Sequence, residues 1–281
     1  MSKSIIDLQD YIPTVNLSEI TNIPNILIKP LIKIYKNGEN NDYPVTFYFL
    51  HYDKTKLTMN NYTTIGLFRS ILMDNNKAYV YSPPKSLPIN SIITTPYSNY
   101  ILEELVEGTM INLFWNSYSK HWDITTKNTM GGYCKYDQDK SITFRDMFLD
   151  AMIKQELEFD DFDKTICYSF VLQHPDNRIV IPFKDSKLIL VGLYKIDGFK
   201  ITILDKYDCK IENIIFPKTF KEYANYQGLN WTDLQNFFQE MSLDYRITGV
   251  NIYNKNNGLR SKIRNPVYEY VRRLKGNSPK L

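Results

Sequence analysis

The sequence is poor in the residues that build disulfide frameworks and metal sites. Its 281 residues include only three cysteines and three histidines. The cysteines are Cys134, Cys167 and Cys209, and the histidines are His51, His121 and His174. Neither set has the close spacing of metal ligands, so we expect no metal site. An odd, small number of cysteines argues against a disulfide-stapled secreted domain and predicts a reduced, intracellular (cytoplasmic) protein.

Long apolar runs and a strong excess of charge are also missing. No stretch approaches the roughly 18 apolar residues of a membrane span, and the first residues lack an apolar signal region, so we expect no signal peptide. The formal net charge is +3, which permits nucleic acid as a partner without requiring it. In residues 255–281, basic side chains greatly outnumber acidic ones. This segment is interpreted either as a solvated tail or as an anion-binding segment.

Short segments rich in β-branched and aromatic residues predict strands along most of the chain. We expect strands at residues 45–51, 65–73, 77–82, 100–106, 108–116, 121–126, 164–172, 177–183, 187–196, 200–205, 247–253 and 259–264. Residues 74–76 predict a hairpin turn, and the proline-rich segment 82–88 predicts a loop, because proline cannot donate to a sheet ladder.

Helical periodicity is clearest over residues 143–157, where Phe and Met recur on one face and Thr143 with Asp146 resembles a capping box. Further helices are expected after Pro217, after Asn230 as N-cap, and over residues 265–274. Many strands with a few inserted helices predict an α+β fold of mainly antiparallel sheets. We expect residues 1–42 to form an N-terminal arm and residues 43–281 to form one domain.

Five segments, in this order, resemble the adenylyltransferase domain of RNA ligases of the phage tRNA-repair type and their relatives in large DNA viruses. The segments are FRSILMD (68–74), LVEGTMI (105–111), HWDITTKNTMGG (121–132), SFVLQHPDNRIV (169–180) and TGVNIYNKNNGLRSKIRNPVY (248–268). The resemblance covers roughly residues 45–275 and implies the nucleotidyltransferase fold of ligases and capping enzymes. It also favours a viral source, with the protein located in an infected host cell or a virion.

The resemblance implies a covalent reaction. In the family a lysine amine attacks the α-phosphate of ATP, and the AMP then passes to an RNA 5′-phosphate before a 3′-hydroxyl displaces it. The resemblance makes no cofactor certain; ATP or GTP with Mg²⁺ is the candidate, and RNA ends would be the partner, with protein partners as a further candidate.

This sequence departs from the family at the reacting groups. Leu105 stands at the nucleophile position, and leucine cannot attack phosphorus. The acid of that motif is Glu107, whereas Ser169 and Thr248 replace acids of later motifs. The resemblance therefore implies no catalytic residue. It leaves a binding site made of Arg69, Glu107, Gly108, Lys127, Arg178, Lys262 and Arg264.

Several of these residues also have simpler interpretations. Gly108 could serve only a turn, and Lys127 and Arg178 could be solvated or paired surface residues. Lys262 and Arg264 alternate with apolar or small residues and share one strand face with Arg260, which favours an anion site. Trp115 and Trp122 are interpreted as a cross-strand packing pair rather than a stacking platform for a base.

Three functions follow from the sequence. The first is a catalytically degenerate RNA-ligase-like protein that binds RNA ends or nucleotides. The second is an active RNA ligase or nucleotidyltransferase with a displaced lysine, for which Lys127 and Lys85 are the candidates. The third is an interaction module that keeps only the fold.

Overall fold

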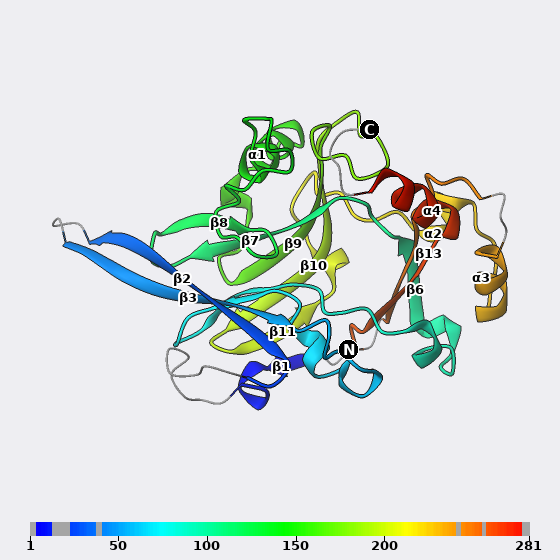
Figure 1. Cartoon of the computed structure of the whole chain (residues 1–281), viewed down its shortest axis with the longest axis horizontal. Helices are drawn as coiled ribbons and strands as arrows, with labels where there is room; N and C mark the ends of the chain where they lie inside the picture. The colour runs from blue at the N-terminus through cyan, green and yellow to red at the C-terminus, as the bar shows by residue number, and fades with distance from the viewer. Residues whose placement is uncertain (1–3, 13–22, 38–40, 240–242, 255–256, 277–281) are drawn as a thin grey trace.

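The computed structural model describes residues 4–12, 23–37, 41–239, 243–254 and 257–276. Three antiparallel sheets dominate this part of the chain (Figure 1). Their strand orders are β1-β11-β10-β9-β7-β8, β2-β3-β4-β5 and β13-β12-β6. The α+β expectation, with mainly antiparallel sheets and few helices, is confirmed.

The strands are β1 (Ile5–Asp7), β2 (Ile26–Asn37), β3 (Asn41–Tyr52), β4 (Ile71–Met73), β5 (Ala78–Tyr81), β6 (Tyr100–Glu104), β7 (Thr109–Asn116), β8 (His121–Thr125), β9 (Ile166–Gln173), β10 (Lys187–Asp197), β11 (Lys200–Leu204), β12 (Gly249–Asn254) and β13 (Arg260–Arg264). The α-helices are α1 (Phe144–Lys154), α2 (Phe220–Ala224), α3 (Trp231–Phe237) and α4 (Pro266–Lys275). Short 3-10 turns connect several of them.

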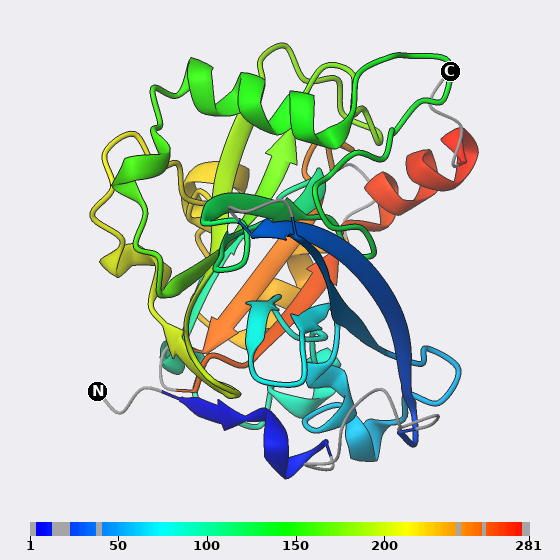
Figure 2. The same ribbon diagram turned by 90° about the vertical axis from the view of Figure 1, so that its left-hand side faces the viewer.

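The six-stranded sheet is covered on both faces. On β9, Tyr168, Phe170 and Leu172 join the hydrophobic cluster that includes the apolar face of α1. Figure 2 shows α1 crossing over this sheet. Cys167, one residue out of phase, instead joins the core shared with the four-stranded sheet, because successive strand residues point to opposite faces.

The N-terminal residues take part in two sheets. β1 pairs with β11 at the edge of the six-stranded sheet, and β2 pairs with β3 along its whole length. Figure 1 shows the far end of this β2–β3 hairpin projecting away from the body of the molecule.

The three-stranded sheet separates a hydrophobic cluster from a polar cavity. Val250 and Ile252 of β12 are fully buried against the side chains of α2 and α3, which include Phe220 and Leu234. Asn251, between the two, faces the opposite side of the sheet and lines the cavity. The alternation along this one strand thus decides which side of the sheet carries polar groups.

Local signals for the helices are confirmed. Thr143 and Asp146 form the capping box of α1, Asn230 caps α3, and Asn265 caps α4 with Pro266 in its first turn. These caps are predictable because each satisfies backbone donors within three residues of itself.

Two strand predictions are wrong. Residues 65–67 form a 3-10 turn, and the backbone N–H groups of Leu67, Phe68 and Arg69 donate within residues 64–67, so only Ile71–Met73 joins a sheet. Residues 177–183 form no strand, because the backbone N–H groups of Val180 and Ile181 donate to the Glu107 carboxylate instead of to a neighbouring strand.

Candidate functional site

A polar cavity of about 220 Å³ lies between the three-stranded sheet and the face of the six-stranded sheet that does not contact α1. Its charged lining residues are the basic Arg69, Arg260, Lys262, Arg264 and Arg272 and the acidic Glu103, Glu104 and Glu107. Its apolar lining residues include Met110, Val171 and Val191 from the six-stranded sheet, and Ile179. The lining therefore combines the basic face of β13 with a hydrocarbon surface from the six-stranded sheet.

Five of the seven predicted site residues meet in this cavity. They are Arg69, Glu107, Gly108, Lys262 and Arg264. Lys127 is exposed just beyond the end of β8 and does not line it. Arg178 also lies outside the lining, where its Nε donates to the carbonyl oxygen of Val180 at 3.1 Å.

The basic face of β13 forms as the alternation predicts. Arg260, Lys262 and Arg264 all line the cavity, whereas Ser261 is fully buried on the other face and donates to the carbonyl oxygen of Leu87. Arg260 also donates its Nε to the carbonyl oxygen of Pro84 at 3.0 Å. The sheet therefore aims three cations at the same space.

Burial and mutual repulsion mark these cations as unusual. Burial, followed by the charges of Arg264, Arg260, Arg69 and Lys85, lowers the pKa of Lys262 to about 7. Burial and the charge of Arg69 likewise lower the pKa of Arg260 to about 10. Within the described residues, no ion pair joins Arg69, Arg260 or Lys262 to a carboxylate.

The carboxylates around the cavity are instead engaged by other groups. Glu103 is 1% exposed and accepts hydrogen bonds from Lys206 Nζ at 2.6 Å, from the Tyr207 hydroxyl at 2.8 Å and from the Asn251 amide at 3.3 Å. Glu269 pairs with Arg264 and, at 3.5 Å, with Arg272.

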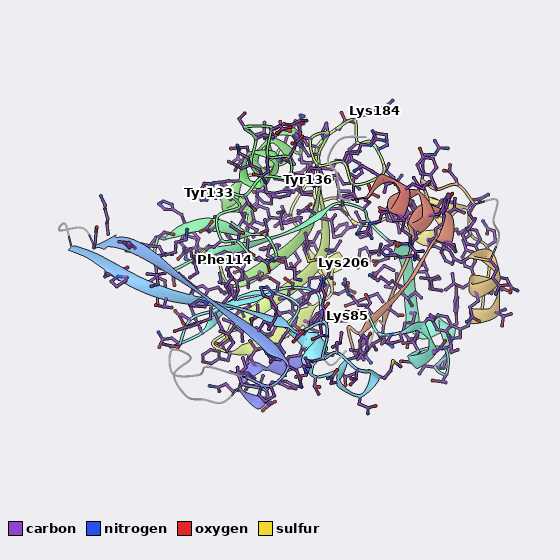
Figure 3. The ribbon with its side chains drawn as sticks, in the orientation of Figure 1. Lys85, Phe114, Tyr133, Tyr136, Lys184 and Lys206 are labelled. Atoms are coloured by element: carbon purple, nitrogen blue, oxygen red, sulfur yellow. The ribbon has the colours of Figure 1, made fainter. Side chains whose placement is uncertain are left out.

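Three residues form a row across the three-stranded sheet. Asn251 on β12 is the register partner of both Glu103 on β6 and Lys262 on β13. The neutral amide therefore separates the acid from the amine. In the view of Figure 3, Lys206 and Lys85 both lie between the six-stranded and three-stranded sheets.

Leu105 continues β6 into the cavity. Its N–H donates to the carbonyl oxygen of Gly249 at 3.1 Å, and its own carbonyl oxygen accepts from the Thr248 hydroxyl. Thr248, expected in the position of a family acid, thus supports the backbone of residue 105. The isobutyl group at this position has no nucleophilic atom.

Glu107 anchors a neighbouring segment rather than remaining free. One carboxylate oxygen accepts from the N–H groups of Val180 and Ile181 at 2.9 and 2.8 Å. Burial, together with this carboxylate, raises the pKa of Tyr268 on α4. The Glu107 side chain therefore ties the segment at Val180 and Ile181 to the cavity.

Glycine is required at two places, at Gly108 in the cavity lining and at Gly249 next to the lining residue Thr248. Gly108 has φ +147°, and a Cβ there would overlap the carbonyl oxygen of Leu172. Gly249 has φ +143°, and a Cβ there would overlap the carbonyl oxygen of Ile263. Both positions bring backbones into close approach, which only glycine allows without strain.

Other residues singled out from the sequence have structural contacts. Ser169 is fully buried and donates to the Asn112 side chain at 2.6 Å, while Val171 is the residue of β9 that lines the cavity. Trp115 and Trp122 are register partners with ring centroids 5.7 Å apart, which confirms the cross-strand packing pair.

Sequence reasoning missed Glu103, Asn251 and Arg272 as cavity residues and Lys206 as a partner. The strand alternation places Asn251 beside Gly249 on one face, but only the pairing of β6 with β12 brings Glu103 into the same row. In the described residues, no group of three or more His, Cys, Asp or Glu gathers where it could hold a metal ion. No helix in this part of the chain is long and apolar enough to cross a membrane.

Comparison with known proteins connects the chain to RNA ligation at a distance. No protein-family model matches it. The chain is 24% identical over 207 residues to a protein named "RNA ligase" from Rhodothermus phage RM378. The aligned stretch covers 62% of this chain and 46% of the phage protein, so the chain spans less than half the length of that relative. The chain is thus RNA-ligase-like.

Proposed function

We propose that this RNA-ligase-like chain has the nucleotidyltransferase fold and that its cavity binds the phosphate of an RNA end or a nucleotide. Residues 43–281 would form the domain, with residues 1–42 as an arm that adds β1 and β2. The proposal is supported by three cations, Arg69, Arg260 and Lys262, which meet in one cavity and form no ion pair in the part of the chain that the structure describes.

Half-buried cations that form no ion pair within the described residues favour an anionic ligand. Removing a charge from water costs free energy unless an opposite charge or hydrogen bonds compensate. Two acids at this site are already paired with other cations, Glu103 with Lys206, and Glu269 with Arg264 and Arg272. A phosphate would supply both the missing charge and acceptor oxygens for guanidinium and ammonium donors.

The apolar side of the cavity suits the remainder of a nucleotide. Met110, Val171 and Val191 present a hydrocarbon surface from the six-stranded sheet. Ligand sites commonly combine an apolar lining with a few convergent polar groups that fix orientation. A base or ribose could lie here while its phosphate contacts β13, so ATP, GTP and a terminal RNA nucleotide all fit the proposal.

Leu105 stands at the position where the family has its reactive lysine, so the covalent step cannot occur there. Because the side chain lacks an amine, no lysyl-AMP can form at residue 105. The proposed function therefore requires binding at this site, not adenylylation of residue 105. It fits a catalytically degenerate ligase domain that recognises RNA ends.

The test compares two RNA oligonucleotides of one sequence, with a 5′-phosphate or a 5′-hydroxyl, by fluorescence anisotropy at several salt concentrations. We expect the phosphorylated RNA to bind at least about tenfold more tightly, with affinity falling as salt rises. Arg69→Met should remove this preference, whereas Lys127→Met, outside the cavity, should keep it. Equal binding of both RNAs, or no binding, would favour a module that keeps only the fold.

A further inference from the structure

We propose that the chain associates head to tail, with the exposed face of α4 in one molecule seated in a second cavity of another copy. This second cavity, which we call the acidic groove, is lined by residues of β9, β10 and β11 and by residues 208–212. The inference goes beyond the proposed function, because it concerns a protein partner and two surfaces that do not line the phosphate cavity.

The acidic groove has a large apolar floor. Its volume is about 540 Å³, which exceeds that of the phosphate cavity. The floor includes Ile166 of β9, Leu204 of β11 and Ile211, which pack against the hydrophobic cluster that contains the apolar face of α1 but are only partly buried. Hydrocarbon that stays open to water in a concave site favours an apolar partner.

Acidic side chains surround this floor. The groove lining contains one basic residue, Lys210, and four exposed acids, which are Asp161, Asp163, Asp208 and Glu212. Within the described residues, none of these acids forms an ion pair. The lining therefore favours a partner that is basic as well as apolar.

The helix α4 carries a surface of this kind. Tyr270 and Leu274 lie four residues apart on one side of the helix and are 63% and 70% exposed. Two residues along an α-helix turn a side chain by about 200°, so this side lies away from Tyr268 and Arg272, which line the phosphate cavity. Arg273 is also exposed, and α4 holds three basic residues against one acid.

The exposed face of α4 complements the acidic groove. An amphipathic helix that places side chains at positions i and i+4 in an apolar groove is a common mode of protein recognition. Tyr270 and Leu274 would cover the apolar floor, while Arg273 would approach the surrounding acids.

The two surfaces belong to different sides of the molecule. Figure 2 shows α4, in red, and the yellow segment that follows β11 on opposite sides, so α4 reaches the groove of another copy and not its own. A contact between two different surfaces leaves one of each unused at the ends. It can therefore continue from copy to copy or close into a ring.

Sedimentation velocity of the full chain, without RNA or nucleotide, tests the association over a range of protein concentrations. We expect the sedimenting species to grow with concentration. High salt should weaken the apparent Kd by at least about tenfold, because it screens the attraction between the basic helix and the acidic groove.

Two variants each disrupt one surface. Leu274→Glu places an acid on the exposed face of α4, and the double variant Asp208→Lys/Glu212→Lys reverses two charges of the groove. Each variant alone should be a monomer. An equimolar mixture should form a complex of two chains, because the groove variant keeps its α4 face and the helix variant keeps its groove. This complex also shows that both variants are folded.

Two further variants are matched controls. Leu229→Glu changes an exposed apolar residue, and Asp185→Lys changes an exposed acid. Both positions lie outside α4 and outside the groove lining, so both variants should associate as the wild type does.

The contrary outcomes are distinct. A wild-type chain that is monomeric at every concentration overturns the inference, and so does a mixture of the two variants that forms no complex. If the groove variant still associates while Leu274→Glu does not, the α4 faces pair with each other. A monomeric wild type whose affinity for RNA falls in Leu274→Glu would assign the α4 face to RNA. Because the sedimentation test uses no ligand, failure of the proposed function would not alter its result.

Discussion

Two lysines, Lys206 and Lys262, lie near the same row of the three-stranded sheet, and they differ in whether a carboxylate pairs with them. Lys206 is 4% exposed and ion-paired to Glu103 at 2.6 Å, with the rings of Tyr207 and Tyr253 close to its ammonium. Lys262 is less buried and has no such partner among the described residues, and burial together with the neighbouring cations lowers its pKa to about 7. Pairing, more than depth, thus decides whether a lysine serves the fold or remains available to a ligand.

Removing the cation of the Lys206–Glu103 ion pair should give the largest effect of the four changes, a loss of stability. Lys206→Met keeps most of the side-chain volume but leaves the Glu103 carboxylate buried without its cation. We expect the free energy of unfolding to fall by about 3–5 kcal/mol, measured by urea denaturation. Lys195→Met, an exposed lysine of β10, is the matched control and should change stability by no more than about 0.5 kcal/mol. A loss as small as the control's would mean that the ion pair does not hold β6 in place.

Giving Lys262 a carboxylate partner should make it resemble Lys206. In Asn251→Asp the new carboxylate is repelled by Glu103 and lies in register with Lys262. An opposite charge raises the pKa of a lysine and competes with a ligand anion, so affinity for 5′-phosphorylated RNA should drop about tenfold. Asn251→Ser, without the charge, should drop less. If the two variants bind alike, the charge environment of Lys262 does not control binding.

Removing the unpaired cation should stabilise the empty protein. The pKa of Lys262 is about 7 in the folded chain against an ordinary value of 10.5. Between these pH values the unfolded chain binds the proton more readily, so stability contributed by this group rises with pH and is lowest below pH 7. Lys262→Met should therefore raise the free energy of unfolding by about 1 kcal/mol at pH 6, after allowance for solvent screening, and by less near pH 10.

Thermal denaturation of Lys262→Met and wild type across this pH range measures the difference directly. Lys127→Met serves as the comparison outside the cavity. A gain that grows with pH, instead of shrinking, would contradict the assigned direction of the Lys262 pKa shift.

The smallest effect, on RNA affinity, is expected from removing the carboxylate partner of Arg264 and Arg272. Glu269→Gln removes the carboxylate that pairs with Arg264 and Arg272. Because partly exposed ion pairs contribute little, affinity for 5′-phosphorylated RNA should rise only about two- to threefold. Asp160→Asn, an exposed acid outside the cavity lining, should leave it unchanged. A loss of affinity in Glu269→Gln would show that Glu269 positions Arg264 for the ligand.

Local sequence signals predict the features that depend on neighbouring residues. The caps of α1, α3 and α4 and the basic face of β13 follow from patterns a few residues long. The strand predicted over 177–183 is wrong because Glu107, about 70 residues earlier, accepts its N–H groups. The apolar composition of residues 177–183 cannot show that a distant carboxylate takes the N–H groups that a neighbouring strand would need.

Contacts between residues far apart in the sequence likewise determine which residues line the cavity. Lys127 and Arg178 fit the motif order, yet the turns after β8 and β9 place them outside the cavity. Glu103 and Lys206 are 103 residues apart, and no sequence pattern connects them. The sequence could therefore identify which strand carries cations, but not which of its neighbours would remain unpaired.

The pairing of β6 with β12 also sets the order in which the molecule can assemble. Asn251 and Glu103 are 148 residues apart. At roughly 5–20 residues per second, a ribosome completes β6 many seconds before β12 exists. Glu103 and Lys206 can meet during that interval, but the cluster of Arg260, Lys262 and Arg264 cannot. A nascent chain thus completes the basic face of β13 only after β6, β9 and β10, and the hydrophobic residues that they carry, have been made.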